Sequence, residues 1–361
     1  MSATETDANI TTRRHAEDAL EPDLVIVDPH HHLWPDGQVR VPPAPGDPDD
    51  AGTTVAVATA YSLDDLRQDV SGGHSVTETV YVECLSHYHD QGPHELRSVG
   101  ETSWVAEQGN QESTGLLSGI VGYADMLLGA ETGRVLDAHL LAAGSRFKGV
   151  RYTVSWDPHV DAYVSPRKPA AGVLLAPAFG RGVAELARRS LVFETWCYFH
   201  QLLELCEMAR QHPELTIVLN HLGGPAANGP YAGRRREVLE SWRRGIHEVS
   251  ECPNIVLKLG AIGMPVFVEP SFLASAPHSS QTIADYWGPE LRFCIETLGP
   301  ERCMFESNFP VDSHLCDYVT LWNSFKLVTA SYAPHWREKL FAGTARQTYK
   351  LEPQRFERAP I

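Results

Sequence analysis

The sequence predicts one α/β domain, a (β/α)8 TIM barrel. Eight short apolar runs of strand length recur between residues 24 and 307, and stretches of helical periodicity separate them. These runs are continuous rather than alternating, as is typical of parallel strands covered on both sides. A doubly wound open sheet is the structural alternative, but no Gly-rich phosphate loop follows any early strand.

The first strand is expected at residues 24–27, where a β-branched run leads directly into Asp28-Pro29-His30-His31-His32-Leu33-Trp34. A long loop, residues 35–73, follows this strand. Its segment 42–48 is too rich in proline for regular structure, whereas residues 62–66 can form one or two helical turns capped by Ser62.

The other elements follow in order, with strands where apolar and β-branched residues run together and helices where apolar residues recur three or four apart. The expected strands are 79–84, 119–123, 147–152, 191–196, 215–221, 255–259 and 302–307. The expected helices are 95–108, 135–141, 183–189, 200–212, 234–249, 282–298 and the region 318–349. A second long loop, residues 157–180, follows the fourth strand, and both long loops are expected to roof the mouth of the barrel.

Composition restricts the partners. The net charge of −16 opposes binding to nucleic acid or to an anionic membrane, so a small-molecule substrate is the expected partner. No apolar run approaches the ~20 residues of a membrane span, and residues 1–22 lack the apolar centre of a signal peptide. We therefore expect a cytoplasmic protein with a flexible arm at 1–22 and a single barrel domain at 23–361. The sequence carries no readable signal of oligomeric state.

Cysteine usage agrees with a reducing compartment. The chain has seven cysteines, an odd number, and none of them forms a CxxC pair. Most lie within apolar stretches. We expect them to be reduced core residues rather than a disulfide framework or a zinc knuckle.

Polar side chains gather where the expected strands end, which is where a barrel of this kind carries its chemistry. His30 and His32 are two residues apart, so they project to one side while His31 projects to the other. Two imidazoles placed in this way can grip a metal ion or a substrate oxygen. The other strand ends carry Glu83, Arg151, Glu194, Trp196, His221, Glu306 and Asn308.

These residue types have both structural and functional interpretations. Arg151 can pair with a buried acid or capture a substrate carboxylate with two hydrogen bonds. Glu83 can be a structural partner or face the substrate. His221 ends a strand at a Gly-Gly-Pro turn, which favours a functional role, whereas His200 opens a helix and faces either the mouth or solvent.

Four segments resemble a known group. Asp-Pro-His-His-His-Leu-Trp, Phe-Lys-Gly-Val-Arg-Tyr, Ile-Val-Leu-Asn-His-Leu-Gly-Gly-Pro and Cys-Met-Phe-Glu-Ser-Asn-Phe-Pro-Val-Asp are similar to amidohydrolase-related TIM-barrel hydrolases. This branch includes 2-pyrone-4,6-dicarboxylate lactonase, fuconolactonase and sulfomuconolactonase. The resemblance implies hydrolysis of small, often carboxylated substrates. It also implies that the strand-1 and strand-6 histidines hold one divalent metal or polarise a carbonyl directly, and that a strand-8 Asp is the general base.

The chain departs from this pattern on strand 8, where Asn308 replaces the Asp. An amide is neither a useful base nor a good metal ligand. The remaining metal ligands are His30, His32 and His221, which suit Zn²⁺, but the missing carboxylate favours a metal-free or weakly binding site. The general base is then expected to be Glu306 or Asp312, which flank Asn308, with Glu83, Glu194 and the histidines as further candidates.

The leading hypothesis is a hydrolase that opens a lactone or related cyclic ester of a small, carboxylated or aromatic substrate. Arg151 would orient the substrate, His30, His32 and His221 would polarise its carbonyl directly or through one Zn²⁺, and Asn308 would donate to the oxyanion. Trp34, Tyr152 and Trp196 would form apolar walls, with Glu83 and His200 also facing the substrate. The alternatives are a metal-dependent decarboxylase or C–C hydrolase of the same superfamily, and a non-catalytic binding protein on the same fold.

Overall fold

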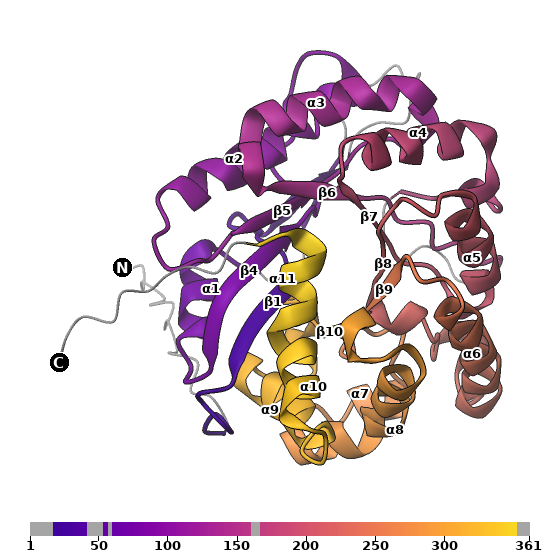
Figure 1. Ribbon diagram of the computed structural model, residues 1–361. Coiled ribbons are helices and arrows are strands. Elements are labelled where there is room, and N and C mark those ends of the chain that lie inside the picture. Colours follow the sequence, from indigo (N-terminus) through magenta and orange to yellow (C-terminus); the bar gives the residue numbers. More distant parts are fainter. Residues whose placement is uncertain (1–16, 42–52, 57–59, 160–166, 352–361) are drawn as a thin grey trace, which may run out of the picture.

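The computed structural model describes residues 17–41, 53–56, 60–159 and 167–351 of the chain. Its main sheet contains eight parallel strands, and each strand pairs with the next one along the chain. They are β1 (Val25–His31), β4 (Ser75–Val82), β5 (Gly119–Gly122), β6 (Phe147–Arg151), β7 (Val192–Thr195), β8 (Ile217–Leu219), β9 (Ile255–Leu259) and β10 (Cys303–Phe305). The predicted barrel is confirmed, with each strand within a few residues of its expected position (Figure 1).

The barrel closes just beyond the end of β10. His31 forms a parallel bridge with Phe309. The amide of His32 donates to the carbonyl of Phe309 at 2.8 Å, and the amide of Asn308 donates to the carbonyl of His30 at 2.9 Å. The segment that carries the histidine pair is therefore held directly by the segment that follows the last strand.

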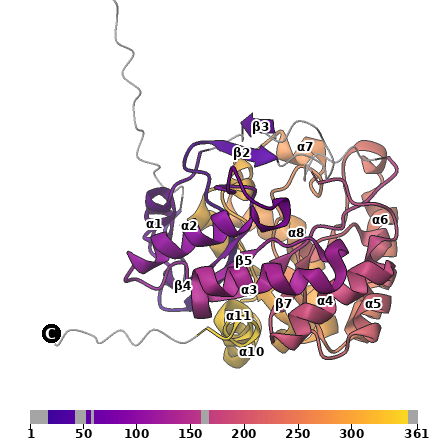
Figure 2. The same ribbon diagram turned by 90° about the horizontal axis from the view of Figure 1, so that it is seen from above.

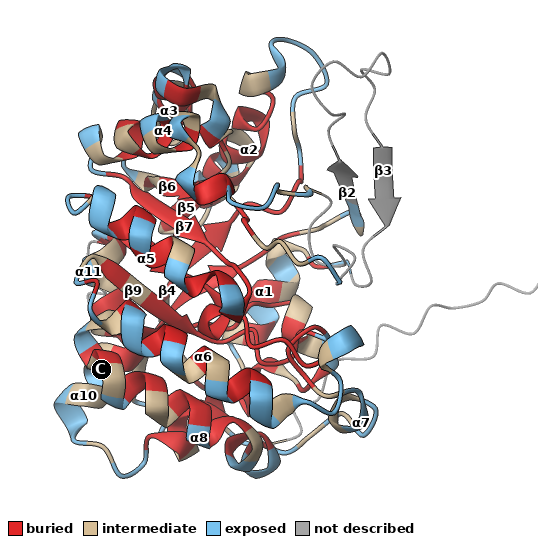
Figure 3. Cartoon of the chain, turned by 90° about the vertical axis from the view of Figure 1, so that its right-hand side faces the viewer, coloured by how far each residue is buried: buried red, intermediate tan, exposed pale blue. Residues whose placement is uncertain are grey.

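Helices surround this barrel, and their outer faces are exposed while the strands are buried (Figures 1 and 3). They are α1 (Leu63–Val70), α2 (Val99–Asn110), α3 (Thr132–Ala143), α4 (Pro177–Arg188), α5 (Leu202–Gln211), α6 (Arg235–Ser250), α7 (Pro270–Leu273), α8 (Ser280–Leu298), α9 (Tyr318–Val328), α10 (Pro334–Glu338) and α11 (Thr344–Tyr349). The region 318–349, predicted as helical throughout, is interrupted after Val328, and a π-helical turn (Lys339–Gly343) joins α10 to α11.

Two layers of side chains fill the barrel. The layer nearer the amino ends of the strands is apolar and packs against Ala345 and Tyr349 of α11; it consists mainly of Val27, Val80, Val82, Val121, Val192, Val218 and Met304. Two residues further along β7, β9 and β10, the inward positions carry Glu194, Lys258 and Glu306, and all three are fully buried. The barrel interior therefore has an apolar layer near the amino ends of the strands and a buried layer of charged side chains near their carboxyl ends.

The loop after β1 is more ordered than the sequence predicts. It contains an antiparallel hairpin of β2 (Gln38–Val41) and β3 (Thr53–Ala56), which lies at the end of the barrel opposite α10 and α11 (Figure 2). The proline-rich segment 42–48 lies outside the described residues. The predicted cap of α1 is confirmed: Ser62 and Asp65 form a capping box.

All seven cysteines are free and buried, as predicted. Part of the predicted N-terminal arm is described, and there Glu21 pairs with Arg337 at 2.6 Å and Glu17 accepts from the amide of Ser280 at 2.8 Å. Among the described residues, no helix combines the length and apolar character of a bilayer span.

Candidate active site

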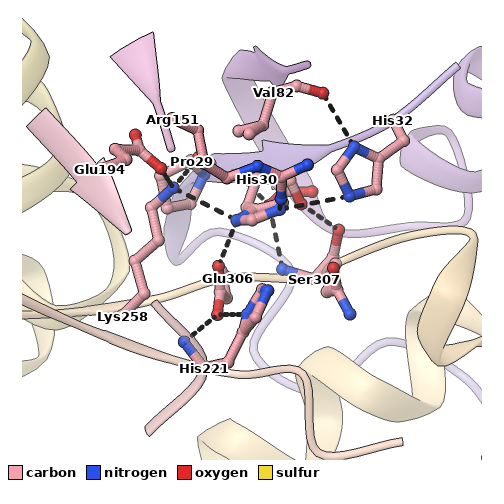
Figure 4. A network of polar contacts seen from close by, with 12 residues as sticks. Pro29, His30, His32, Val82, Arg151, Glu194, His221, Lys258, Glu306 and Ser307 are labelled. Atoms are coloured by element: carbon pink, nitrogen blue, oxygen red, sulfur yellow. Dashed lines mark hydrogen bonds and ion pairs between the residues drawn. The ribbon is translucent and has the colours of Figure 1, made fainter. Parts of the chain in front are cut away.

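Three side chains from different strand ends form the centre of the site (Figure 4). The carboxylate of Glu306 lies between two imidazoles: its Oε2 is 2.7 Å from His30 Nδ1 and its Oε1 is 2.8 Å from His221 Nδ1. The backbone amide of His221 also donates to Glu306 Oε1, at 3.2 Å. All three residues are buried, so these interactions lie in a medium of low polarity, where they are stronger than in water.

The second histidine of the pair extends this centre. As the alternation of β1 predicts, His32 faces His30, with their Nε2 atoms 3.3 Å apart, while His31 bonds to Thr79 at 2.9 Å on the other side. His32 Nδ1 lies 2.8 Å from the carbonyl oxygen of Val82. Since a carbonyl only accepts, Nδ1 carries the proton and Nε2 of His32 has a free lone pair.

Arg151 lies beside the histidine pair but is already engaged. Its Nη1 is 3.3 Å from His30 Nε2, its Nε donates to Glu83 Oε1 at 3.0 Å, and its Nη2 donates to the carbonyl oxygen of Glu83. Of the two roles expected for Glu83, structural partner or substrate contact, these contacts favour that of a structural partner, here to Arg151. Arg151 contributes positive charge to the site, and its Nη1 points toward the reacting centre.

A second arginine, which the sequence analysis did not single out, shares Glu83. Arg167 arrives from the loop after β6, donates to Glu83 Oε2 at 3.1 Å and stacks over the ring of Tyr123, 3.5 Å from its centroid. Burial raises the pKa of Glu83, but the charges of Arg167 and Arg151 outweigh burial and the pKa is lowered. No sequence pattern marks Arg167, because its position depends on the path of an irregular loop.

Lys258 was also missed. It is fully buried in β9 and donates to Glu194 Oε2 at 2.8 Å and to the carbonyl oxygen of Pro29 at 2.9 Å, and its Nζ is 3.3 Å from His30 Nδ1. A signal was present, since a lysine in the middle of a buried strand rarely occurs without a charged partner. Glu194, a base candidate, is engaged by this lysine and by the hydroxyl of Tyr349.

Asn308 and Asp312 form a separate pair. Asn308 Nδ2 donates to Asp312 Oδ1 at 2.8 Å, and the amide of Gly263 donates to Oδ2 at 3.0 Å. Burial raises the pKa of Asp312 to about 8. In the described part of the chain, Asp312 is thus held by Asn308 and by the backbone of Gly263 and Ile262, whereas Glu306 contacts two histidines.

The predicted aromatic walls are arranged around this centre. Trp34 stacks on His32 with ring centroids 5.2 Å apart, and Trp196 lies 6.3 Å from His221. Tyr152 lies against Tyr123, the ring that carries Arg167. His200 instead bonds to Asp157 at 2.9 Å and stacks on Tyr198, so it belongs to the surrounding loops.

Local backbone features explain why these side chains converge. Asp28 of the first strand joins it to the segment that follows the last strand. Its carboxylate accepts from the amide of Ser307 at 3.0 Å and from the hydroxyl of Tyr318 at 3.0 Å. Gly260 leaves room for Glu306, whose Cγ would lie 2.3 Å from a Cβ at that position. His221 and Asn308 both have left-handed φ angles, 59° and 55°, a rare conformation that concentrates at functional sites.

The electrostatic environment keeps the histidine pair uncharged. Burial, together with the charges of Lys258 and Arg151, holds the pKa of His30 well below its usual range; burial and the charge of Arg151 do the same for His32. Both rings are therefore neutral near pH 7 and retain one lone pair each. Beside His221, Asn220 is fully buried and its amide oxygen and nitrogen have no partner among the described residues. These groups offer hydrogen-bonding capacity to a bound molecule.

The donor set also fits a divalent metal. One ligand atom each from His30, His221 and Glu306 lies within 4.8 Å of the others. Glu306 Oε2 is buried and lies 2.7 Å from His30 Nδ1, but it makes no hydrogen bond in the described structure, so it offers a lone pair for coordination. Two imidazoles and a carboxylate suit Zn²⁺. This set replaces His32, one of the three predicted ligands, with Glu306.

Comparisons with known proteins show the family of the chain. The amidohydrolase family profile matches residues 27–351. The chain is 31% identical to the uncharacterized protein y4mH of Sinorhizobium fredii, over 91% of this chain and 99% of that protein. It is 24% identical to the L-fucono-1,5-lactonase of Burkholderia multivorans, over 70% of this chain and 77% of that enzyme.

A solved structure shows the same fold. An amidohydrolase from Burkholderia multivorans, crystallised with bound zinc, superposes with a TM-score of 0.67 at 21% identity, covering 91% of this chain and all of that chain. The family match, which spans most of the sequence, identifies the chain as a member of the amidohydrolase family.

Proposed function

We propose that this amidohydrolase-family enzyme hydrolyses a lactone or related cyclic ester that carries an anionic group. The observation that supports this most directly is the pair of His221 and Glu306, which lies against His30, while Arg151 contacts His30 and shares Glu83 with Arg167. The L-fucono-1,5-lactonase relative gives the reaction class, and the local charges of the site give the anionic substituent.

His221 acts as the general base in this proposal. Its Nδ1 donates to Glu306 Oε1 at 2.8 Å, which leaves Nε2 with a free lone pair. Nε2 takes a proton from water as the water oxygen attacks the lactone carbonyl carbon. The protonated His221 then returns this proton to the ring oxygen as the carbonyl C–O bond breaks, which yields a hydroxy acid. Glu306 orients the imidazole and stabilises its charged form.

Negative charge that develops on the carbonyl oxygen is stabilised by Arg151, whose Nη1 lies 3.3 Å from His30 Nε2. Arg151 is buried, so its effect is greater than in water. A divalent ion held by His30, His221 and Glu306 would supply Lewis-acid polarisation of the same oxygen. Asn308, which we expected to be an oxyanion donor, has one amide hydrogen committed to Asp312 and one left for this role.

The test is a panel of lactones with and without a carboxylate, measured for wild type and His221→Gln with a pH indicator. Loss of the base is expected to lower kcat by about 10²- to 10⁴-fold. His247→Gln, on the exposed face of α6, is the matched control and should keep full activity. Equal turnover by both variants would contradict the assignment. Stoichiometric metal without any lactone hydrolysis would instead favour a decarboxylase or C–C hydrolase.

A further inference from the structure

Residues 83–88, the loop that follows β4, bind both arginines of the site. Glu83 accepts from Arg151 Nε at 3.0 Å through one carboxylate oxygen and from Arg167 Nη1 at 3.1 Å through the other. The hydroxyl of Tyr88 accepts a further hydrogen bond from Arg167. The position of both guanidinium groups therefore depends on the conformation of this loop.

The same loop anchors one of the aromatic walls. The carbonyl oxygen of Cys84 accepts from Trp34 Nε1 at 3.1 Å, and Trp34 stacks on His32. A displacement of the loop would therefore reach the histidine pair as well as the arginines.

Two residues of this loop adopt a backbone conformation that needs support. Leu85 and His87 have left-handed φ angles of 64° and 54°, although neither is a glycine. Such residues rarely adopt this conformation, and it persists where surrounding contacts hold it. The loop therefore requires contacts that fix its backbone.

Glu101, in the first turn of α2, supplies such contacts. Its Oε1 accepts from the amides of Cys84 and Ser86, at 2.8 and 3.0 Å, and from the hydroxyl of Tyr81 at 2.8 Å. Both amides lie beyond the end of β4, where the carboxylate provides the acceptor that a neighbouring strand would otherwise provide. Glu101 is 1% exposed, so water does not compete for these donors.

The first turn of α2 also lies directly against the loop. A Cβ at Gly100 would be 2.5 Å from the carbonyl oxygen of His87, so no side chain fits between them. The amide of His89 donates to the carbonyl oxygen of Arg97, just before the helix, at 2.9 Å. The carboxylate of Glu101 is thus held on a helix that is packed against the segment it binds.

The contacts of Glu101 do not require its negative charge. Burial, and the nearby charge of Glu83, raise the pKa of Glu101 to about 7. The neutral acid still has a carbonyl oxygen that accepts hydrogen bonds. The second oxygen, Oε2, is buried and makes no hydrogen bond among the described residues. A glutamine at this position should therefore replace the acid, whereas a side chain without an acceptor should not.

We propose that Glu101 is a positioning residue, which fixes residues 83–88 in the conformation in which Glu83 and Tyr88 orient the two arginines. It acts on Arg151 and Arg167 through this loop. The kinetic arm of the test rests on the proposed function, because it detects the arginines through lactone hydrolysis.

The test compares Glu101→Met, which removes the acceptor, with Glu101→Gln, which keeps it. Glu290→Met is the matched control, because Glu290 is a buried carboxylate that pairs with Arg235 and Arg243 away from the site. For a carboxylate-bearing lactone, Glu101→Met should raise KM about tenfold or more, and Glu101→Gln should keep KM within about threefold of wild type. A KM of folded Glu101→Met within about threefold of the control would overturn the proposal, since a merely structural role would lower stability alone.

A second measurement needs no substrate. In ¹⁵N NMR, the indole N–H of Trp34, assigned from Trp34→Phe, reports the position of the Cys84 carbonyl oxygen. Its resonance should shift in Glu101→Met and keep its wild-type position in Glu101→Gln and Glu290→Met. An unshifted resonance in Glu101→Met would count against the proposal.

A third measurement uses wild type alone, so it does not depend on the folding of a variant. Hydrogen exchange at the amides of Cys84 and Ser86 should be much slower than at the exposed residues Gln91 and Gly92 of the same loop region. Equally fast exchange would overturn the proposal. If the lactone panel failed while the indole shift and the slow exchange were observed, the proposed substrate would be wrong and the role of Glu101 would stand.

Discussion

Replacing Glu306 with Gln tests the central pair of the site. The side chain keeps its shape and an acceptor for His221, but the negative charge between the two imidazoles is lost. Two unit charges separated by the observed 2.8 Å interact by about 6 kcal/mol at an effective dielectric constant of 20. The amide dipole and local relaxation recover part of this energy. We therefore expect the transition state, in which His221 becomes charged, to lose about 3–5 kcal/mol, or about 10²- to 10⁴-fold in kcat.

The assay is steady-state hydrolysis of the lactone that wild type turns over best, with circular dichroism to confirm folding. Glu290→Gln is the matched control, because Glu290 is a buried carboxylate that pairs with Arg235 and Arg243 away from the site. Glu306→Asp should retain some activity because it keeps the charge. If Glu306→Gln kept kcat within about threefold of the Glu290→Gln control, His221 could not depend on this carboxylate.

Three further outcomes follow from other contacts. The pKa of Asp312 is raised by burial to about 8, against an ordinary value of 3.8, so the folded state binds the extra proton and stability falls as pH rises through this window. Asp312→Asn should reduce the loss of unfolding free energy between pH 5 and pH 8, by at most about 4 kcal/mol in urea titrations; an unchanged pH dependence would refute a buried, protonated Asp312. Arg167→Met should raise KM about 10- to 100-fold for carboxylate-bearing lactones and leave neutral ones unaffected, and an equal change for both would exclude a charge-recognition role. Tyr349→Phe removes a hydrogen bond to the carboxylate of Glu194 and should lower the unfolding free energy by about 1–3 kcal/mol; no change in the denaturation midpoint would contradict that contribution.

The barrel and the approximate strand positions could be predicted because they depend on local patterns. Continuous apolar runs mark buried parallel strands, and the polar residues at their ends mark the mouth. The convergence of His30, His32, His221 and Glu306 follows from this rule alone. The hairpin β2–β3 was not predicted, since its strands are only four residues long, lie within a proline-rich loop and pair with each other.

The roles of individual charges were harder to predict, because they depend on distances across the barrel. For Arg151 the sequence left open pairing with a buried acid or capture of a substrate carboxylate, and Glu83 occupies two of its nitrogen atoms. Arg167 comes from an irregular loop, so its approach to the same carboxylate has no counterpart in strand periodicity. Lys258 was predictable in principle, since it projects from β9 to the face opposite Leu257 and Leu259, but its partner could not be identified without the fold.

Asn308 stands where the family resemblance leads one to expect an Asp, and the carboxylate at this strand end belongs to Glu306. Glu306 directly follows β10, whereas Asn308 lies two residues further along, where its φ is 55°. Glu306 has one more methylene than Asp, and Gly260 leaves space beside it. Its carboxylate therefore reaches Nδ1 of His30 and Nδ1 of His221. From that position it orients the imidazole that would take the proton rather than meeting the attacking water itself. Asn308 then has no need of basicity, and its amide serves to hold a buried acid, Asp312.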